Sequence, residues 1–271
     1  MTAALERPRK IRRPRVAWEV LDALAIAERN LRATRRHPDQ LLDVTLQPIV
    51  FVLIFGVVFG GALQGATGGN YVNYLMAGIF VQTAIFGSMT TGLGLAEDLQ
   101  KGLLDRFRSL PMGRSSVMVG RALSDLVRLL LSIAVMVVTG FLIGFAPSGG
   151  PVAWLEGLAL LLVFSFAVSW IAIAIALLLW RNPLAVQSTA FVVVFPLTFL
   201  SSAFVPASTL PAWLRPLAAN QPVSVLIDTL RALMLGQPVG DGPLRVVAWA
   251  IVLIAVGIPL SARLYRRINK G

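Results

Sequence analysis

Long runs without charged side chains are the feature that most constrains this chain. Residues 44–96, 157–180, 182–214 and 246–262 contain no Asp, Glu, Lys or Arg. A helix that crosses a bilayer needs about 20 mostly apolar residues. Because lipid offers no partner to backbone N–H and C=O groups, such runs are expected to be helices. The sequence therefore predicts an all-α, polytopic membrane protein, and its charged fraction of 14% is far below the roughly 25% of soluble domains.

Six spans follow from these runs and the breaks between them. They are predicted at residues 44–63, 74–95, 126–145, 154–179, 185–204 and 245–262. Ten Lys and Arg residues precede the first span, five lie between the second and third, and four follow the sixth, whereas the segments after spans one and three have none. The positive-inside rule then places both termini and the second loop in the cytoplasm. The net charge of +11 is explained by this topology and by anionic lipid headgroups rather than by nucleic acid.

Three parts of the chain are expected. Residues 1–15 form a basic, flexible N-terminus without the apolar region of a signal peptide. Residues 16–37 place Trp18, Leu21 and Leu24 at helical spacing with arginines elsewhere, which is typical of a helix lying in the headgroup layer. A simple anchor and a partner contact both remain open for it. Residues 38–271 form the transmembrane domain.

The segment between spans five and six predicts an irregular outer structure. It contains six prolines, too many for one spanning helix. Residues 223–235 nevertheless have the pattern of an amphipathic helix, and Asp228 and Arg231 are spaced to form an ion pair. About 13 residues are too few to cross a bilayer. We therefore expect a re-entrant or interfacial helical hairpin on the outside.

A short charged segment, LQKGLLDRFRSLP, follows span two. Leu99, Leu103, Phe107 and Leu110 recur at helical spacing, and Pro111 ends the pattern. Such a short amphipathic helix is marginal in water and must bury its apolar stripe. The membrane face, the inner ends of the bundle and another protein all remain possible partners.

Three stretches resemble one transporter family. LLDVTLQPIVFVLIFGVVFGGAL, EDLQKGLLDRFRSLPMGRSSVMVGRALSD and VVFPLTFLSSAFVPASTLPAWLRPLAANQPVSVLIDTLRAL look like the ABC-2-type permeases of the daunorubicin/doxorubicin-resistance branch. The similarity covers about residues 40–235. It implies that the helix between spans two and three is a coupling helix that docks on a separate ATPase, and that residues 16–37 are the connecting helix. The implied contact residues are Glu97, Asp98, Lys101, Asp105, Arg106, Phe107 and Arg108.

The resemblance also implies a cargo path. In such permeases spans two and five face the route between two permease halves. Both spans of this chain combine phenylalanines with uncharged polar groups, which suits an amphipathic, largely apolar cargo, although such hydroxyls also bond neighbouring helices. The predicted path residues are Phe80, Gln82, Thr83, Phe86, Thr90, Phe191, Phe195, Pro196, Thr198 and Phe199.

The chain has no residues for nucleotide or catalytic chemistry of its own. It contains no Gly-x-x-x-x-Gly-Lys-Ser/Thr motif, no cysteine and one histidine, so we assign no catalytic, cofactor-binding or metal-ligating residue. ATP and magnesium are expected on a partner ATPase present in two copies.

The predicted function is that of a permease subunit in an ATP-driven exporter of the bacterial plasma (inner) membrane. The cargo is expected to be a hydrophobic or amphipathic drug or lipid-like molecule. The other expected partners are membrane lipids and a second permease copy or a sister permease. A polysaccharide or glycolipid exporter is the alternative, and a membrane-embedded enzyme or scaffold is a remote one. The identity of the cargo and of the second permease stays open.

Overall fold

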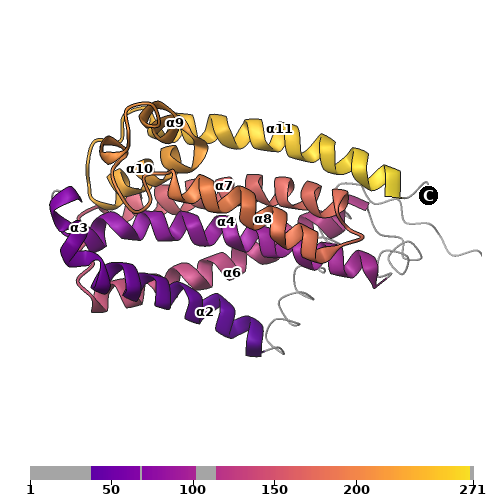
Figure 1. Ribbon diagram of the computed structural model, residues 1–271, viewed down its shortest axis with the longest axis horizontal. Coiled ribbons are helices and arrows are strands. Elements are labelled where there is room, and N and C mark those ends of the chain that lie inside the picture. The colour runs from indigo at the N-terminus through magenta and orange to yellow at the C-terminus, as the bar shows by residue number, and fades with distance from the viewer. Residues whose placement is uncertain (1–37, 68, 102–113, 269–271) are drawn as a thin grey trace, which may run out of the picture.

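The computed structural model describes residues 38–67, 69–101 and 114–268, and the regular elements in these ranges are all helices. Figure 1 shows an elongated bundle in which the long helices run side by side. The structure therefore confirms the all-α class. Residues 1–37, with the predicted basic terminus and interfacial helix, lie outside the described residues. The predicted division into three parts stays a prediction.

The helical elements differ widely in length. In chain order they are α2 (Pro38–Leu53), η1 (Ile54–Val58, a π-helical turn), α3 (Gly60–Thr67), α4 (Tyr71–Gln100), α6 (Arg114–Leu142), α7 (Pro151–Leu178), α8 (Pro183–Phe199), η2 (Ala207–Thr209, a 3₁₀ turn), α9 (Arg215–Asn220), α10 (Pro222–Met234) and α11 (Gly242–Ile268).

Among the residues that the structure describes, four helices are long and apolar enough to cross a membrane. They are α4, residues Ala122–Leu142 of α6, α7 and α11, and they contain the predicted spans two, three, four and six almost entirely. Their length and composition make this chain an integral membrane protein with several spans.

The other two predicted spans differ from the structure in their bounds. The stretch 44–63 is divided, because regular α-helix gives way to η1 at Ile54 and breaks at Phe59 in a glycine-rich sequence that disfavours helix. The stretch 185–204 is helical only to Phe199, where α8 ends three residues after Pro196. Their apolar helices, Leu46–Val58 and Pro183–Phe199, are shorter than the other four.

Small residues let the central helices approach closely. A Cβ on Gly92 of α4 would lie 2.7 Å from the carbonyl oxygen of Ala172 in α7, and one on Gly257 of α11 would lie 2.8 Å from Cβ of Trp170. Hydroxyls add hydrogen bonds at these crossings, as from Ser261 to the carbonyl of Trp170 at 3.2 Å. Such packing is how helices associate in lipid, where the hydrophobic effect between helices is absent.

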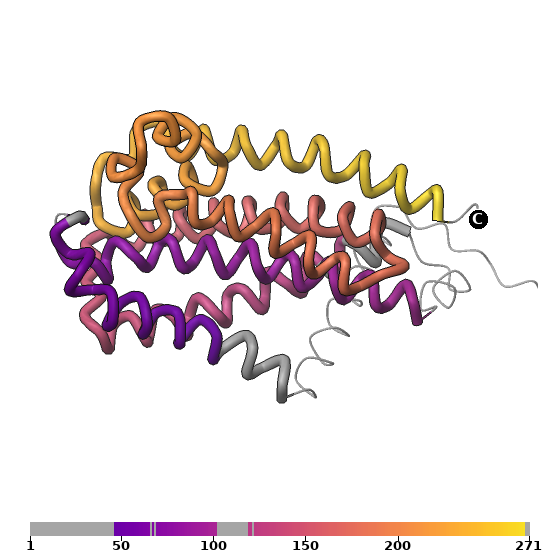
Figure 2. The backbone as a smooth tube through the Cα atoms, viewed as in Figure 1, coloured from indigo at the N-terminus to yellow at the C-terminus, as the bar shows by residue number. Residues whose placement is uncertain are grey.

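The two ends of the bundle have different structures. At one end, which we call the α10 end, lie α3, α9, α10 and the start of α4 (Figure 1). The tube in Figure 2 shows the chain after α8 folding back over this end before α11 runs the length of the bundle. At the opposite end, the loop end, α4 ends and α6 begins. The predicted helix 223–235 is confirmed as α10, which packs against α4, α7 and α11.

Candidate functional site

Three predicted path residues form an exposed row along α8. Phe191, Phe195 and Phe199 are spaced four residues apart, so the helix brings them onto one face, and their exposed fractions are 57%, 42% and 41%. Their rings lie against one another, with centroids 5.2 Å apart for the first pair and 4.3 Å apart for the second. The opposite face of α8 is buried against α4. This arrangement leaves one side of the aromatic row open.

The row continues beyond α8 through residues that sequence reasoning did not assign. Phe204, in the turns after α8, lies 5.2 Å from Phe199 between ring centroids, and 4.4 Å from Phe55 in η1. Phe55 in turn stacks on Phe51 and Phe59 at 5.8 and 5.5 Å. We call the whole series the phenylalanine ladder. Its members are Phe51, Phe55, Phe59, Phe191, Phe195, Phe199 and Phe204.

The ladder differs from the exposed apolar surface of α11. The exposed large hydrophobic side chains of α11 are all aliphatic. Aliphatic side chains are sufficient for contact with lipid tails. Stacked rings add attraction of about 0.5–1.5 kcal/mol per pair beyond the area they bury. The ladder is therefore suited to hold another flat aromatic group.

Backbone irregularities occur in both helical parts of the ladder. Pro196 lies inside α8 and has no N–H to donate to the carbonyl of the preceding turn, which makes bending there easier. Phe55 lies within η1, and single π-helical turns are frequent at functional sites. The ladder thus combines ring stacking with two positions where the helices can adjust.

The predicted path residues of α4 are mostly covered within the single chain. Phe80 and Gln82 are 3% and 5% exposed, and Phe86 is partly buried. The hydroxyl of Thr83 lies 3.6 Å from the sulfur of Met136 in α6. Thr90 is exposed and its hydroxyl donates to the carbonyl of Gly87 at 2.7 Å. These side chains do not join the exposed ladder.

Two of the polar path residues are buried in the bundle. Thr198 on α8 donates its hydroxyl to the carbonyl of Val194 at 2.9 Å. Gln82 lies one helical turn along α4 from Gly78, which contacts the segment after α8. Its side-chain oxygen has no hydrogen-bond partner among the described residues. A buried amide oxygen of this kind can accept a hydrogen bond from a ligand or a rearranged side chain.

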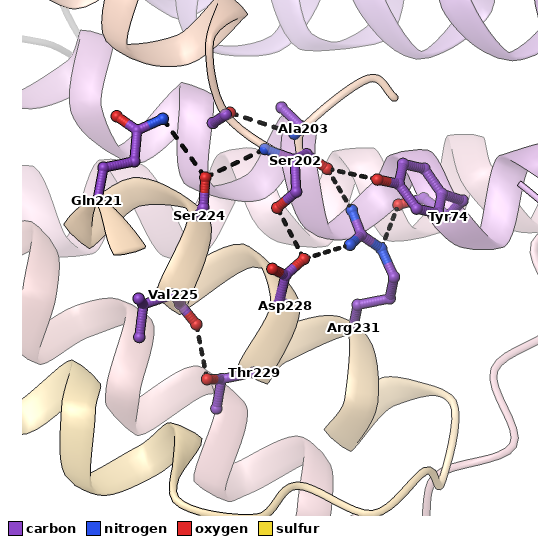
Figure 3. Close-up of polar contacts among 10 residues, drawn as sticks. Tyr74, Ser202, Ala203, Gln221, Ser224, Val225, Asp228, Thr229 and Arg231 are labelled. Atoms are coloured by element: carbon purple, nitrogen blue, oxygen red, sulfur yellow. Dashed lines mark hydrogen bonds and ion pairs between the residues drawn. The ribbon is translucent and has the colours of Figure 1, made fainter. Parts of the chain in front are cut away.

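A polar cluster joins α10 to α4 at the α10 end (Figure 3). Its centre is Arg231, whose side chain is 11% exposed. The guanidinium donates to Asp228 at 2.6 Å, to the carbonyl of Ser202 at 2.7 Å and to the carbonyl of Tyr74 at 3.1 Å. It also lies 3.6 Å from the centre of the Tyr74 ring. The predicted ion pair between Asp228 and Arg231 is confirmed, and the structure shows that it is one contact of four.

The same cluster fixes the segment that follows α8. The hydroxyl of Ser202 donates to Asp228 at 2.7 Å. The hydroxyl of Tyr74 donates to the carbonyl of Ser202 at 2.9 Å. The amide of Ser202 donates to the hydroxyl of Ser224 on α10 at 3.2 Å (Figure 3). Tyr71 donates its hydroxyl to the carbonyl of Phe204 at 3.2 Å. The cluster therefore positions Phe204, the ring that joins the two parts of the ladder.

Three of the predicted ATPase-contact residues lie at the end of α4, and the other four follow it in the sequence. Glu97 and Lys101 form an exposed ion pair at 3.7 Å, and Asp98 is partly buried. The pair is four residues apart on the helix surface, so it contributes little to stability. Asp105, Arg106, Phe107 and Arg108 lie outside the described residues. No group of three metal-ligating side chains converges in the parts of the chain that the structure describes.

The fold and this site together define the class as a polytopic helical membrane protein with an aromatic face and a polar cluster at one end. Residues 22–235 match the ABC-2 type transporter family, and the chain belongs to that family. It is 34% identical over 257 residues to the daunorubicin resistance ABC transporter permease protein DrrB1 of Streptomyces coeruleorubidus, covering 95% of this chain and 90% of that protein.

Two further relatives show the same similarity over most of their length. One is the probable doxorubicin resistance ABC transporter permease protein DrrC of Mycobacterium tuberculosis, 26% identical, covering 91% of this chain and 90% of the relative. The other is the putative transport permease ycf38 of Porphyra purpurea, which is 27% identical; the match covers 79% of this chain and 75% of that relative. These matches confirm the family and branch that the sequence motifs predicted.

Proposed function

We propose that this chain is the permease subunit of an ATP-driven exporter in a bacterial plasma membrane, and that its cargo is a hydrophobic or amphipathic drug-like molecule. The family supports the transport role, and the relatives named for daunorubicin and doxorubicin resistance support such a cargo. The observation on this chain that carries the cargo class is the phenylalanine ladder, because its exposed rings favour a flat aromatic molecule.

The loop end is proposed to face the cytoplasm. Arg266 and Arg267 lie in the last turn of α11, and Lys101 follows the last residue of α4, so basic residues gather at this end. Six spans with both termini inside is the arrangement we propose, and it makes the α10 end the outer end. The segment from η2 to α10 would then be a re-entrant or interfacial hairpin on the outside.

Energy is proposed to come from a separate ATPase subunit in two copies. The absence of a phosphate-binding Gly-rich motif from the sequence supports this division of labour. The proposed docking element is the segment between α4 and α6, with Glu97, Asp98 and Lys101 at its start. A second copy of this chain or a sister permease would complete the route. ATP binding would move the coupling helices, and bending of α8 at Pro196 would pass cargo along the ladder toward the outer end.

Replacing one phenylalanine of the ladder with leucine is expected to weaken transport of a flat cargo. In proteoliposomes that contain the permease and its ATPase, Phe195→Leu and Phe204→Leu should each raise the KM for ATP-dependent doxorubicin transport by roughly 2–10-fold. Leucine keeps the apolar volume but removes ring stacking. The measurement is the change in doxorubicin fluorescence on addition of ATP.

Two controls make this test specific. Phe141→Leu removes an exposed ring from α6, outside the ladder, and should leave the KM unchanged. Phe141 is 56% exposed and Phe195 is 42% exposed, whereas Phe204 is 7% exposed and acts by joining Phe199 to Phe55. Transport of an aliphatic amphiphile should also be unchanged in the ladder variants. If Phe195→Leu and Phe204→Leu transport doxorubicin like the unmodified chain, the ladder is not the cargo path.

A further inference from the structure

A hydrogen bond joins the two helices that flank the proposed coupling segment. The hydroxyl of Thr91 on α4 donates to a carboxylate oxygen of Asp125 on α6. Thr91 lies roughly 2.5 helical turns before Gln100, the end of α4, and Asp125 lies about 3 turns after Arg114, the start of α6. The two residues therefore lie at similar distances, along α4 and along α6, from the segment that connects these helices.

Both members of this bond are buried. Thr91 is 4% exposed and Asp125 is 6% exposed. A carboxylate is costly to bury in an apolar bundle, and an ionisable residue at such a position is a functional-site candidate by default. A hydrogen bond to a charged acceptor is about twice as strong as a neutral one, and a low local dielectric strengthens it further. The bond therefore joins the two helices through polar groups in a buried position.

Two further α4–α6 contacts lie nearer the α10 end and involve no charged group. Thr83 reaches only the sulfur of Met136, and the methyl group of Met76 packs against the site of Gly140. Such apolar contacts resist separation of two helices but allow them to slide. On its other side α4 is held to α7, where Gly92 adjoins Ala172. The Thr91–Asp125 bond thus connects α6 to the α4–α7 core at a fixed register.

We infer that Thr91 and Asp125 are positioning residues that make α4 and α6 move as one unit when the ATPase displaces the segment between them. The inference rests on the proposed function. With the bond intact, motion of that segment is transmitted along both helices to α8, which packs against α4 and carries part of the ladder on its other face. Without it, α4 and α6 lose this connection near the coupling segment, and ATP is hydrolysed without a matching movement of cargo.

The test is the number of cargo molecules transported per ATP hydrolysed, measured in proteoliposomes that contain permease and ATPase, with doxorubicin as the cargo. Thr91→Val keeps the shape of threonine and removes the hydroxyl, and it should lower this ratio about tenfold while ATPase activity and co-purification persist. Thr91→Ser should restore the ratio. Thr139→Val is the matched control, since that buried hydroxyl on α6 donates only within its own helix, to Val135 at 2.9 Å.

The outcomes separate the inference from the proposal on which it rests. An unchanged ratio in Thr91→Val would overturn the positioning role alone, as would a fall in transport and ATPase activity in equal proportion. If Thr91→Val does not fold, Thr91→Ala provides the same comparison, because it removes the hydroxyl that donates to Asp125 without adding an apolar branch. No ATP-driven transport by the unmodified complex would overturn both the inference and the proposed function.

Discussion

Replacing Arg231 with methionine is expected to lower the free energy of unfolding by about 2–4 kcal/mol. The guanidinium donates to one carboxylate and two backbone carbonyls and lies over the Tyr74 ring. Methionine fills part of the volume but makes none of these hydrogen bonds. The segment after α8 would lose its connection to α10, so Phe204 would no longer be held between Phe199 and Phe55. Thermal unfolding of the purified chain measures the loss.

Two comparison variants test whether the loss of stability is specific to Arg231. Asp228 is 51% exposed at its side chain, so Asp228→Asn leaves water to replace the lost contact and should cost about 1 kcal/mol or less. Arg245→Met removes an arginine at the same end that donates to Asn220 at 2.9 Å in an exposed position, and it should change little. Equal losses for Arg231→Met and Arg245→Met would contradict the central role of Arg231 in the cluster.

The second large effect is expected from Gly78→Ala. A Cβ at this position would lie 2.4 Å from the carbonyl oxygen of Ala203 and 2.8 Å from its Cα. Both are backbone atoms, so no side-chain rotation relieves the clash, and the segment after α8 must move away from α4. Overpacking of this kind costs about 1–3 kcal/mol. The movement should also weaken doxorubicin transport, because it displaces Phe204 next to Ala203.

Gly87→Ala is the matched control on the same helix. No atom of the described residues lies within 4 Å of a Cβ built there, and alanine favours helix over glycine, so this variant should be as stable as the unmodified chain or slightly more stable. Unfolding temperature and transport are measured for both. If Gly78→Ala is as stable and as active as Gly87→Ala, the close contact between α4 and the segment after α8 does not matter for function.

The long apolar helices could be predicted because their signal is local. An uncharged run of sufficient length defines α7 or α11 without any knowledge of neighbours, and the pattern of residues 223–235 defines α10 in the same way. The ends of α2 and α8 could not be predicted equally well. The helices break at the glycines near Phe59 and at the turns after Pro196. Both breaks lie inside continuous apolar sequence, so hydropathy does not predict them.

The candidate site could be predicted only in part for a similar reason. Phe191, Phe195 and Phe199 share a helix face, so spacing alone groups them. Phe204 and Phe55 are far apart along the chain. They join the row only because the turns after α8 pack against η1 in the folded structure. Arg231 was predicted to pair with Asp228, three residues away, but its bonds to Ser202 and Tyr74 cross between segments that no local pattern connects.

We propose that a separate ATPase drives this permease through the segment between α4 and α6. The most direct test combines Asp105→Ala, Arg106→Ala and Phe107→Ala in one variant and measures co-purification with the ATPase and stimulation of ATP hydrolysis. We expect a folded, membrane-inserted chain that neither binds the ATPase nor stimulates it. Normal binding and stimulation by this triple variant would contradict the account.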